Sequence, residues 1–424
     1  MFPKLLFKNT FLLFVLLVFS CGNSVSKVKG ESKKEKGEII DSIKTNKKII
    51  LGADNSTKYL PLLNNKKVGV VTNQTGILSN RTHLVDFLFE QKVQATKIFA
   101  PEHGFRGTAD AGEHIANGKD SKTGLPIISL YGNNKKPKPE QIAGIDVMIF
   151  DIQDVGARFY TYISTLHYVM EACAEQNISL LVLDRPNPNI DIVDGPILEE
   201  EFKSFVGMHK IPVLHGMTIG EYAKMINGEK WLEKGIQCKL TVIPCENYTR
   251  NMSYSLPVKP SPNLPNDQAI NLYTSLCFFE GTNVSVGRGT DKQFQVYGSP
   301  YLKVGDNIVA EDGTKQELVL NHYKFTPKPN EGAKDPLYNG KVCHGVDLSE
   351  IEKVSRLELK WLLKAYNETD DKSKFFNSFF TKLAGTKKLQ QQIENGIPEN
   401  KIRVSWQEGL EKFKEMRKKY LIYN

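Results

Sequence analysis

Short apolar runs alternate with amphipathic stretches between about residues 66 and 184. Runs of strand length lie at 68–72, 96–99, 127–131, 146–151 and 180–183. Residues 84–89 and 163–174 instead repeat their apolar side chains at helical spacing. Nearly all-apolar strands that alternate with helices are typical of a parallel sheet covered on both faces. The pattern therefore predicts an α/β fold with a Rossmann-like, mostly parallel sheet.

The pattern changes near residue 260. Residues 259–265 are rich in proline, which favours a linker or a rigid loop. Towards the C-terminus, one helical stripe carries Trp406, Leu410, Phe413, Met416 and Tyr420. Such a stripe indicates a helix packed on a core rather than a ligand site.

The first fifty residues have the character of an export segment. Lys4 and Lys8 precede an apolar run at 11–19 that is too short to span a bilayer and suits the core of a signal peptide. Ser20-Cys21-Gly22 follows, and this order resembles a bacterial lipoprotein cleavage site. We expect a signal peptide over 1–20, acylation of Cys21, a flexible tether over 21–50, and a periplasmic protein that is lipid-anchored to a membrane. An ordinary cleaved signal is the alternative.

Charge adds little to this description. The formal charge of +8 is concentrated in the first fifty residues, so the remainder is nearly neutral. This distribution gives no support to nucleic-acid binding. Apart from Cys21, the cysteines lie at 173, 238, 245, 277 and 343, with no CxxC pair. Cys173 and Cys277 lie in apolar segments and suit a core, whereas Cys238 and Cys245 could form a local disulfide.

Polar segments follow four of the predicted strands, at 73–76, 101–107, 151–158 and 184–189. In a parallel sheet, ligands bind beyond the carboxyl ends of the strands, so these segments should meet at one edge. No GxGxxG opens the first crossover, which disfavours a dinucleotide cofactor. His103, Asp110, Glu113 and His114 lie close in sequence, but without HExxH spacing we expect no catalytic metal. No cofactor is expected.

Together with later segments, these motifs resemble the exo-β-N-acetylmuramidase family, glycoside hydrolases long described only as a domain of unknown function. The segments that carry the resemblance lie at 71–76, 101–104, 151–162, 184–188, 261–265, 280–283 and 287–290. The resemblance covers the chain from about residue 51 to its end. It implies a Rossmann-like catalytic domain over 51–260, a smaller α+β domain over 261–424, and an active-site cleft between them.

The resemblance also implies an activity, which is the release of terminal β-linked N-acetylmuramic acid from the non-reducing ends of peptidoglycan fragments. Such hydrolysis needs a carboxylic acid that protonates the leaving oxygen. Glu102 is the leading candidate for this acid, and His103 beside it is a further catalytic candidate. Asp151 and Asp154 could activate water or hold sugar hydroxyls, or one of them could only cap a helix that begins near Arg158. Attack by the substrate's own acetamido group remains open beside direct attack by water.

Muramic acid carries a lactyl carboxylate, and an arginine can bind a carboxylate with two parallel hydrogen bonds. Arg106, Arg158 and Arg288 are the candidates, unless each pairs with a structural carboxylate. The remaining residues expected to bind substrate are Asn73, Tyr160, Asn187, Asn263, Glu280 and Thr290. A non-catalytic muropeptide-binding lipoprotein is the alternative function. A serine esterase is disfavoured because no GxSxG motif is present.

Overall fold

The computed structural model describes residues 48–105, 118–304, 307–309, 315–317 and 321–424. The expectations for Cys21 and Arg106 lie outside these residues. From residue 47 onward the chain forms one compact unit. Among the residues described, we find no helix with both the length and the apolar character needed to cross a membrane.

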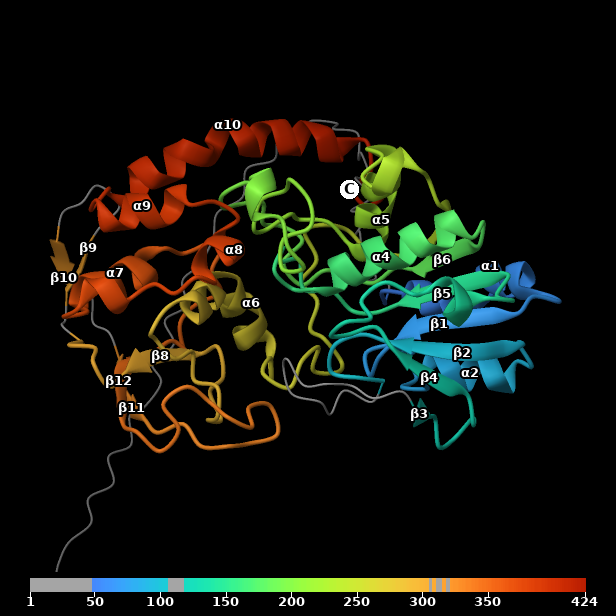
Figure 1. Cartoon of the computed structure of the whole chain (residues 1–424), viewed down its shortest axis with the longest axis horizontal. Coiled ribbons are helices and arrows are strands. Elements are labelled where there is room, and N and C mark those ends of the chain that lie inside the picture. Colours follow the sequence, from blue (N-terminus) through green and yellow to red (C-terminus); the bar gives the residue numbers. More distant parts are fainter. Residues whose placement is uncertain (1–47, 106–117, 305–306, 310–314, 318–320) are drawn as a thin grey trace, which may run out of the picture. The chain divides into compact units, whose positions relative to one another are not determined.

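A seven-stranded sheet organises the first half of this unit, with the strand order β3-β4-β2-β1-β5-β6-β7 (Figure 1). Its strands are β1 Val68–Thr72, β2 Ala95–Ala100, β3 Gly118–Lys119, β4 Pro126–Ser129, β5 Val147–Asp151, β6 Ser179–Leu183 and β7 Lys239–Ile243. All neighbouring pairs are parallel except β3 with β4. The predicted mostly parallel α/β sheet is confirmed.

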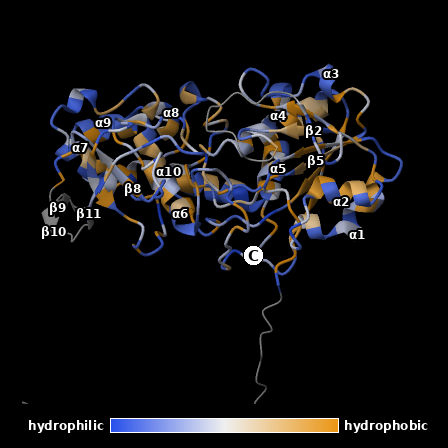
Figure 2. Cartoon of the chain, turned by 90° about the horizontal axis from the view of Figure 1, so that it is seen from below, coloured by the Kyte–Doolittle hydropathy of each residue, from blue (hydrophilic) through white to orange (hydrophobic). Residues whose placement is uncertain are grey.

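In the central strands, alternate residues enter two different cores, as the two-residue period of a strand requires. On β5, Val147 and Ile149 pack in one core with helix α2 Leu84–Glu90. Met148 and Phe150 enter the other core, with α4 Tyr162–Glu175 and α5 Ile219–Gly228. Helix α2 carries both hydrophobic and hydrophilic residues, as a helix with one face on the sheet should (Figure 2). The short helices α1 and α3 span Ser56–Tyr59 and Pro139–Ile142.

The second half, which is the chain beyond residue 260, is built mainly of helices, with small antiparallel sheets. Strands β8 Val296–Ser299, β11 Asn321–Phe325 and β12 Cys343–Asp347 form one sheet, and β9 Asn307–Val309 pairs with β10 Lys315–Glu317. The helices are α6 Asp267–Leu276, α7 Lys360–Glu368, α8 Phe380–Ala384, α9 Lys388–Glu394 and α10 Glu399–Lys418. The predicted stripe lies on α10 and at its end, and Trp406, Leu410 and Phe413 are buried as expected. These residues belong to the same core that covers the β5 face, so the two halves share a core.

The described cysteines are all buried and unpaired, which confirms the core positions expected for Cys173 and Cys277. The alternative of a disulfide between Cys238 and Cys245 is wrong. The two residues flank opposite ends of strand β7, Lys239–Ile243, and a strand rises by about 3.3 Å per residue, so their sulfurs cannot meet.

Candidate active site

The sheet order places the ends of β2, β1, β5 and β6 next to one another, as the polar segments at these ends predicted. A cavity of about 500 Å³ lies beside the segment that follows β2. Its walls come from four parts of the sheet half (Glu102–His103, Tyr131, Phe159–Tyr162 and Phe205–Val206) and from the chain beyond residue 260. Residues from both halves therefore line one site.

The carboxylate of Glu102 is held by two hydroxyl groups. Tyr131 Oη donates to Oε1 at 2.9 Å, and Thr161 Oγ1 donates to Oε2 at 3.1 Å. Glu102 belongs to a tight turn after β2, in which Gly104 N donates to Pro101 O. His103 has a φ of +69° in this turn, and its Nε2 lies 3.2 Å from Ser261 Oγ. The turn thus fixes both Glu102 and His103 on the cavity wall.

Glu280 and Arg288 form an ion pair on the cavity wall contributed by the second half. Arg288 Nε and Nη2 both lie 2.7 Å from Glu280 Oε1, and the Cys277 thiol contacts Oε2 at 3.5 Å. The guanidinium also lies 5.1 Å from the centre of the Phe294 ring. Among the described residues that line the cavity, Arg288 is the only lysine or arginine. Arg288 thus does pair with a carboxylate, as the alternative allowed, and it still lies on the cavity wall, where it can meet a substrate anion.

Tyrosine side chains form much of the buried wall. Tyr160 Oη donates to Pro260 O at 2.7 Å, and Tyr162 Oη accepts from Asn73 Nδ2 at 2.8 Å. Burial raises the pKa of both phenols, so both are neutral near pH 7. Asn73 itself is buried and absent from the described cavity lining, and it reaches the cavity wall through its contact with Tyr162.

Asp151 and Asp154 lie outside the described cavity lining. Arg185 donates to both carboxylate oxygens of Asp151, through Nε at 2.6 Å and Nη2 at 2.8 Å. Asp154 accepts from Gly156 N at 2.7 Å, and burial raises the pKa of its carboxyl to about 7. Neither carboxylate caps a helix near Arg158, because α4 begins only at Tyr162 and lacks a side-chain cap.

Arg158 is also directed away from the cavity. Its guanidinium is buried and donates to the backbone carbonyls of Pro196, Ile211, Leu383 and Ala384. The last two belong to α8, so Arg158 joins the two halves rather than pairing with a carboxylate. The structure gives it no access to substrate through the cavity.

Three further predicted residues make backbone contacts outside the described lining. Asn187 donates to Met217 O, Asn263 donates to Gly332 O, and Thr290 Oγ1 donates to Gly287 O. Gly332 does line the cavity, so Asn263 shapes its wall indirectly. In contrast, Tyr131 and Thr161 were missed as partners of Glu102. Their signals were present, since Tyr131 ends a predicted strand and Thr161 lies in the 151–162 motif.

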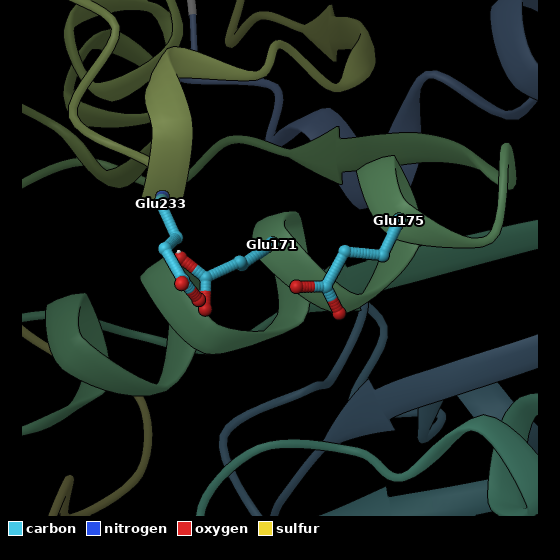
Figure 3. A group of neighbouring side chains, drawn as sticks. All are labelled: Glu171, Glu175 and Glu233. Atoms are coloured by element: carbon cyan, nitrogen blue, oxygen red, sulfur yellow. Dashed lines mark hydrogen bonds between the residues drawn. The ribbon is translucent and has the colours of Figure 1, made fainter.

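An acidic cluster away from the cavity needs separate comment because its geometry resembles a cation site. Glu171, Glu175 and Glu233 bring one oxygen each within 4.8 Å of one another (Figure 3). Lys136 Nζ lies 2.7 Å from both Glu171 and Glu175. Since the lysine already supplies the positive charge, the cluster is an ion-pair network.

The chain matches models of known families over nearly all its described length. Residues 68–268 match the N-terminal part, and residues 271–423 the C-terminal part, of the exo-beta-N-acetylmuramidase NamZ. The peptidoglycan beta-N-acetylmuramidase NamZ of Bacillus subtilis is 40% identical over 388 residues, which are 86% of this chain and 89% of that protein.

Two solved structures of DUF1343 family proteins from Bacteroides fragilis share the fold. One is 44% identical with a TM-score of 0.78, and the other is 28% identical with a TM-score of 0.74. In each case the match covers 89% of this chain and 99% of the solved one. On these matches, the chain belongs to the NamZ family of exo-β-N-acetylmuramidases.

Proposed function

We propose that this protein is an exo-acting glycoside hydrolase that releases terminal β-linked N-acetylmuramic acid from the non-reducing ends of peptidoglycan fragments. The observation that carries the proposal is one cavity with Glu102 on one wall and Arg288 on another, in a chain that is 40% identical to a β-N-acetylmuramidase. A carboxyl group and a cation are the two groups that cleavage and recognition of a muramide require.

Glu102 acts in this proposal as the acid that protonates the leaving oxygen. Tyr131 and Thr161 hold its two oxygens, so little side-chain freedom is lost when the substrate arrives. The other described carboxylates of the cavity belong to Glu280 and Asp335. Because Glu280 is bound to Arg288, the described groups of the cavity wall that could activate a water are His103 and Asp335. Attack by the substrate acetamido group needs only a polarising group.

Arg288 binds the lactyl carboxylate. Glu280 occupies the Nε–Nη2 edge of the Arg288 guanidinium, and the guanidinium lies over the Phe294 ring. These two contacts fix the guanidinium before substrate binds. A fixed cation favours an anionic muramide over a neutral glucosaminide.

The test is a comparison of two chromogenic substrates with the purified protein. We expect release of the chromophore from a β-N-acetylmuramide, and far slower release from the matching β-N-acetylglucosaminide. Binding of the muramide without hydrolysis would instead identify a muropeptide-binding protein. Equal hydrolysis of the two substrates would contradict the role given to Arg288.

We further propose that the protein is exported and held on a membrane through acylated Cys21. The support is the order of a short apolar run and Ser20-Cys21-Gly22 in the sequence. An acyl anchor would keep the enzyme beside the cell wall whose fragments it degrades.

A further inference from the structure

The cavity changes from buried to exposed along its walls. His103, Tyr162 and Phe294 are almost fully buried, as are most of the tyrosine and phenylalanine side chains that line it. Glu102 and Thr161 are half-buried. Leu337 and Phe379 line the same cavity with 49% and 36% of their surfaces exposed. The site thus has a closed end and an apolar rim. The exposed fraction of Glu102 is intermediate between those of the residues at the closed end and at the rim.

This rim pair, Leu337 and Phe379, is unusual for the molecule. Both belong to a small set of large hydrophobic side chains that are exposed in the described part of the chain. Most apolar side chains of this size are buried, because each costs free energy in water. Because this pair borders the cavity, a ligand that extends out of the cavity can cover it.

The geometry of exo cleavage identifies the occupant. The terminal muramyl residue must fill the closed end, since nothing precedes it in the glycan. The next sugar continues the chain toward solvent and must therefore pass the rim. A pyranose ring presents C–H groups that pack on apolar side chains, and the exposed carboxylate of Asp335 on the same rim can accept from its hydroxyls.

We infer that Leu337 and Phe379 bind the sugar on the reducing side of the cleaved bond. This inference rests on the proposed function and adds to it a preference for a saccharide leaving group. The enzyme gains affinity from the second sugar of a muramyl glycan, and free N-acetylmuramic acid lacks this contact.

The experiment measures two dissociation constants by titration calorimetry, in a Glu102→Gln background that slows turnover. The probes are free N-acetylmuramic acid and the disaccharide in which it is β-linked to N-acetylglucosamine. Leu337→Ser combined with Phe379→Ser should raise the Kd of the disaccharide about tenfold, which corresponds to about 1.4 kcal/mol. The Kd of the monosaccharide should stay within about twofold, a change of about 0.4 kcal/mol.

Phe89→Ser is the matched control, because Phe89 is 59% exposed on α2 and does not line the cavity. It should change neither Kd. The inference is overturned if the rim substitutions raise the Kd of both ligands equally. It is also overturned if they leave both Kd values unchanged. Cleavage of the disaccharide by the unsubstituted protein tests the proposed function separately. If cleavage occurs and the rim variants bind normally, only the rim inference fails.

Discussion

Glu102 is the residue on which the chemistry of the site depends. Glu102→Gln keeps the size of the side chain, and its amide oxygen can accept from one of the two hydroxyls while its NH2 group donates to the oxygen of the other, but it cannot deliver a proton. We expect kcat to fall about 10²–10⁴-fold for a substrate with a poor leaving group. The loss should be smaller for a nitrophenyl muramide, whose leaving group needs no protonation.

Steady-state kinetics on both substrates check this prediction, with circular dichroism as evidence of folding. Equal losses on good and poor leaving groups would assign Glu102 a polarising, base or nucleophilic role instead. Normal activity on both would remove it from the chemistry, and Asp335 would be the next carboxylate to test because it lines the same cavity.

Arg288 gives a prediction about specificity rather than rate. Arg288→Lys keeps the charge but loses the planar fork, so KM for the muramide should rise by the equivalent of about 1.5–3 kcal/mol, the range of a hydrogen bond to a charged group. KM for the glucosaminide should not change, because that substrate lacks the carboxylate. Arg356→Lys is a suitable control, since Arg356 pairs with Glu358 and lies outside the described lining. If the kinetics of Arg288→Lys are unchanged, Arg288 does not bind the lactyl carboxylate, and Arg106 becomes the candidate.

Asp154 gives a prediction about pH. Burial raises the pKa of its carboxyl to about 7, whereas the unfolded chain has the usual value near 4. The folded state therefore binds the proton more tightly, and this tighter binding stabilises the fold. The stabilisation is complete below about pH 4 and is lost as the pH rises to 7. His215 Nε2 lies 3.8 Å away, but burial lowers the pKa of that ring to about 3, so it supplies no compensating charge.

Asp154→Asn cannot ionise, and its amide oxygen can still accept from Gly156 N. Relative to the unsubstituted protein, the variant should gain stability between pH 4 and 7, by up to about 4 kcal/mol. Urea unfolding at several pH values measures this difference. Asp291→Asn, at an exposed position, controls for the change in net charge. A constant difference across the range would contradict the prediction.

The same residues show what sequence can and cannot say about a site. The motif at 151–162 marks the correct strand end, but the period of two along β5 puts Asp151 on the side of Val147 and Ile149, where Arg185 meets it. Glu102 could be chosen because a turn after a strand is visible in sequence. That Arg158 is directed into the interior could not be foreseen, because its acceptors are backbone carbonyls from segments far apart in the chain.

At the scale of elements, the C-terminal segment after α10 returns to the sheet half. Tyr423 Oη donates to Asp184 Oδ2 at 2.6 Å and accepts from Cys245 N at 2.9 Å. Asp184 directly follows β6, and Arg250 N donates to Asn424 O. Tyr423→Phe would leave buried polar groups without this hydroxyl, so the free energy of unfolding should fall by about 1–3 kcal/mol.

Denaturant melts of Tyr423→Phe measure that loss, and Tyr301→Phe at an exposed position is the control. Activity at a temperature where the variant stays folded should be unchanged, because Tyr423 is not among the residues that line the cavity. A variant as stable as the parent would show that this contact does not stabilise the packing of the C-terminal segment on the sheet half.

Most of the strands that sequence predicted are buried ones, and the run at 127–131 predicted the more exposed β4 as well. Strands β1, β2, β5 and β6 are largely apolar, and each matches a predicted run within one residue at either end. β7 was missed because it is an edge strand whose residues alternate between exposed and half-buried. Strands β11 and β12 of the second half were missed because they are rich in polar residues, although they are as long as β1. Pairing between distant segments, not local pattern, forms them.

At the scale of the whole molecule, the chain divides into the part from Lys47 onward, which holds every described residue of the cavity, and the first 46 residues. We predict that Cys21→Ala moves the protein from the membrane fraction to the soluble fraction of fractionated cells, because one cysteine carries the proposed acyl chains. A form that begins at Lys47 behind a cleavable signal should be soluble as well, and should keep the kcat and KM of the parent on the chromogenic muramide. If the unsubstituted protein is already soluble after export, the anchor does not exist. If the shortened form is soluble but kinetically impaired, the first 46 residues contribute to the site itself, and the division between anchor and enzyme is wrong.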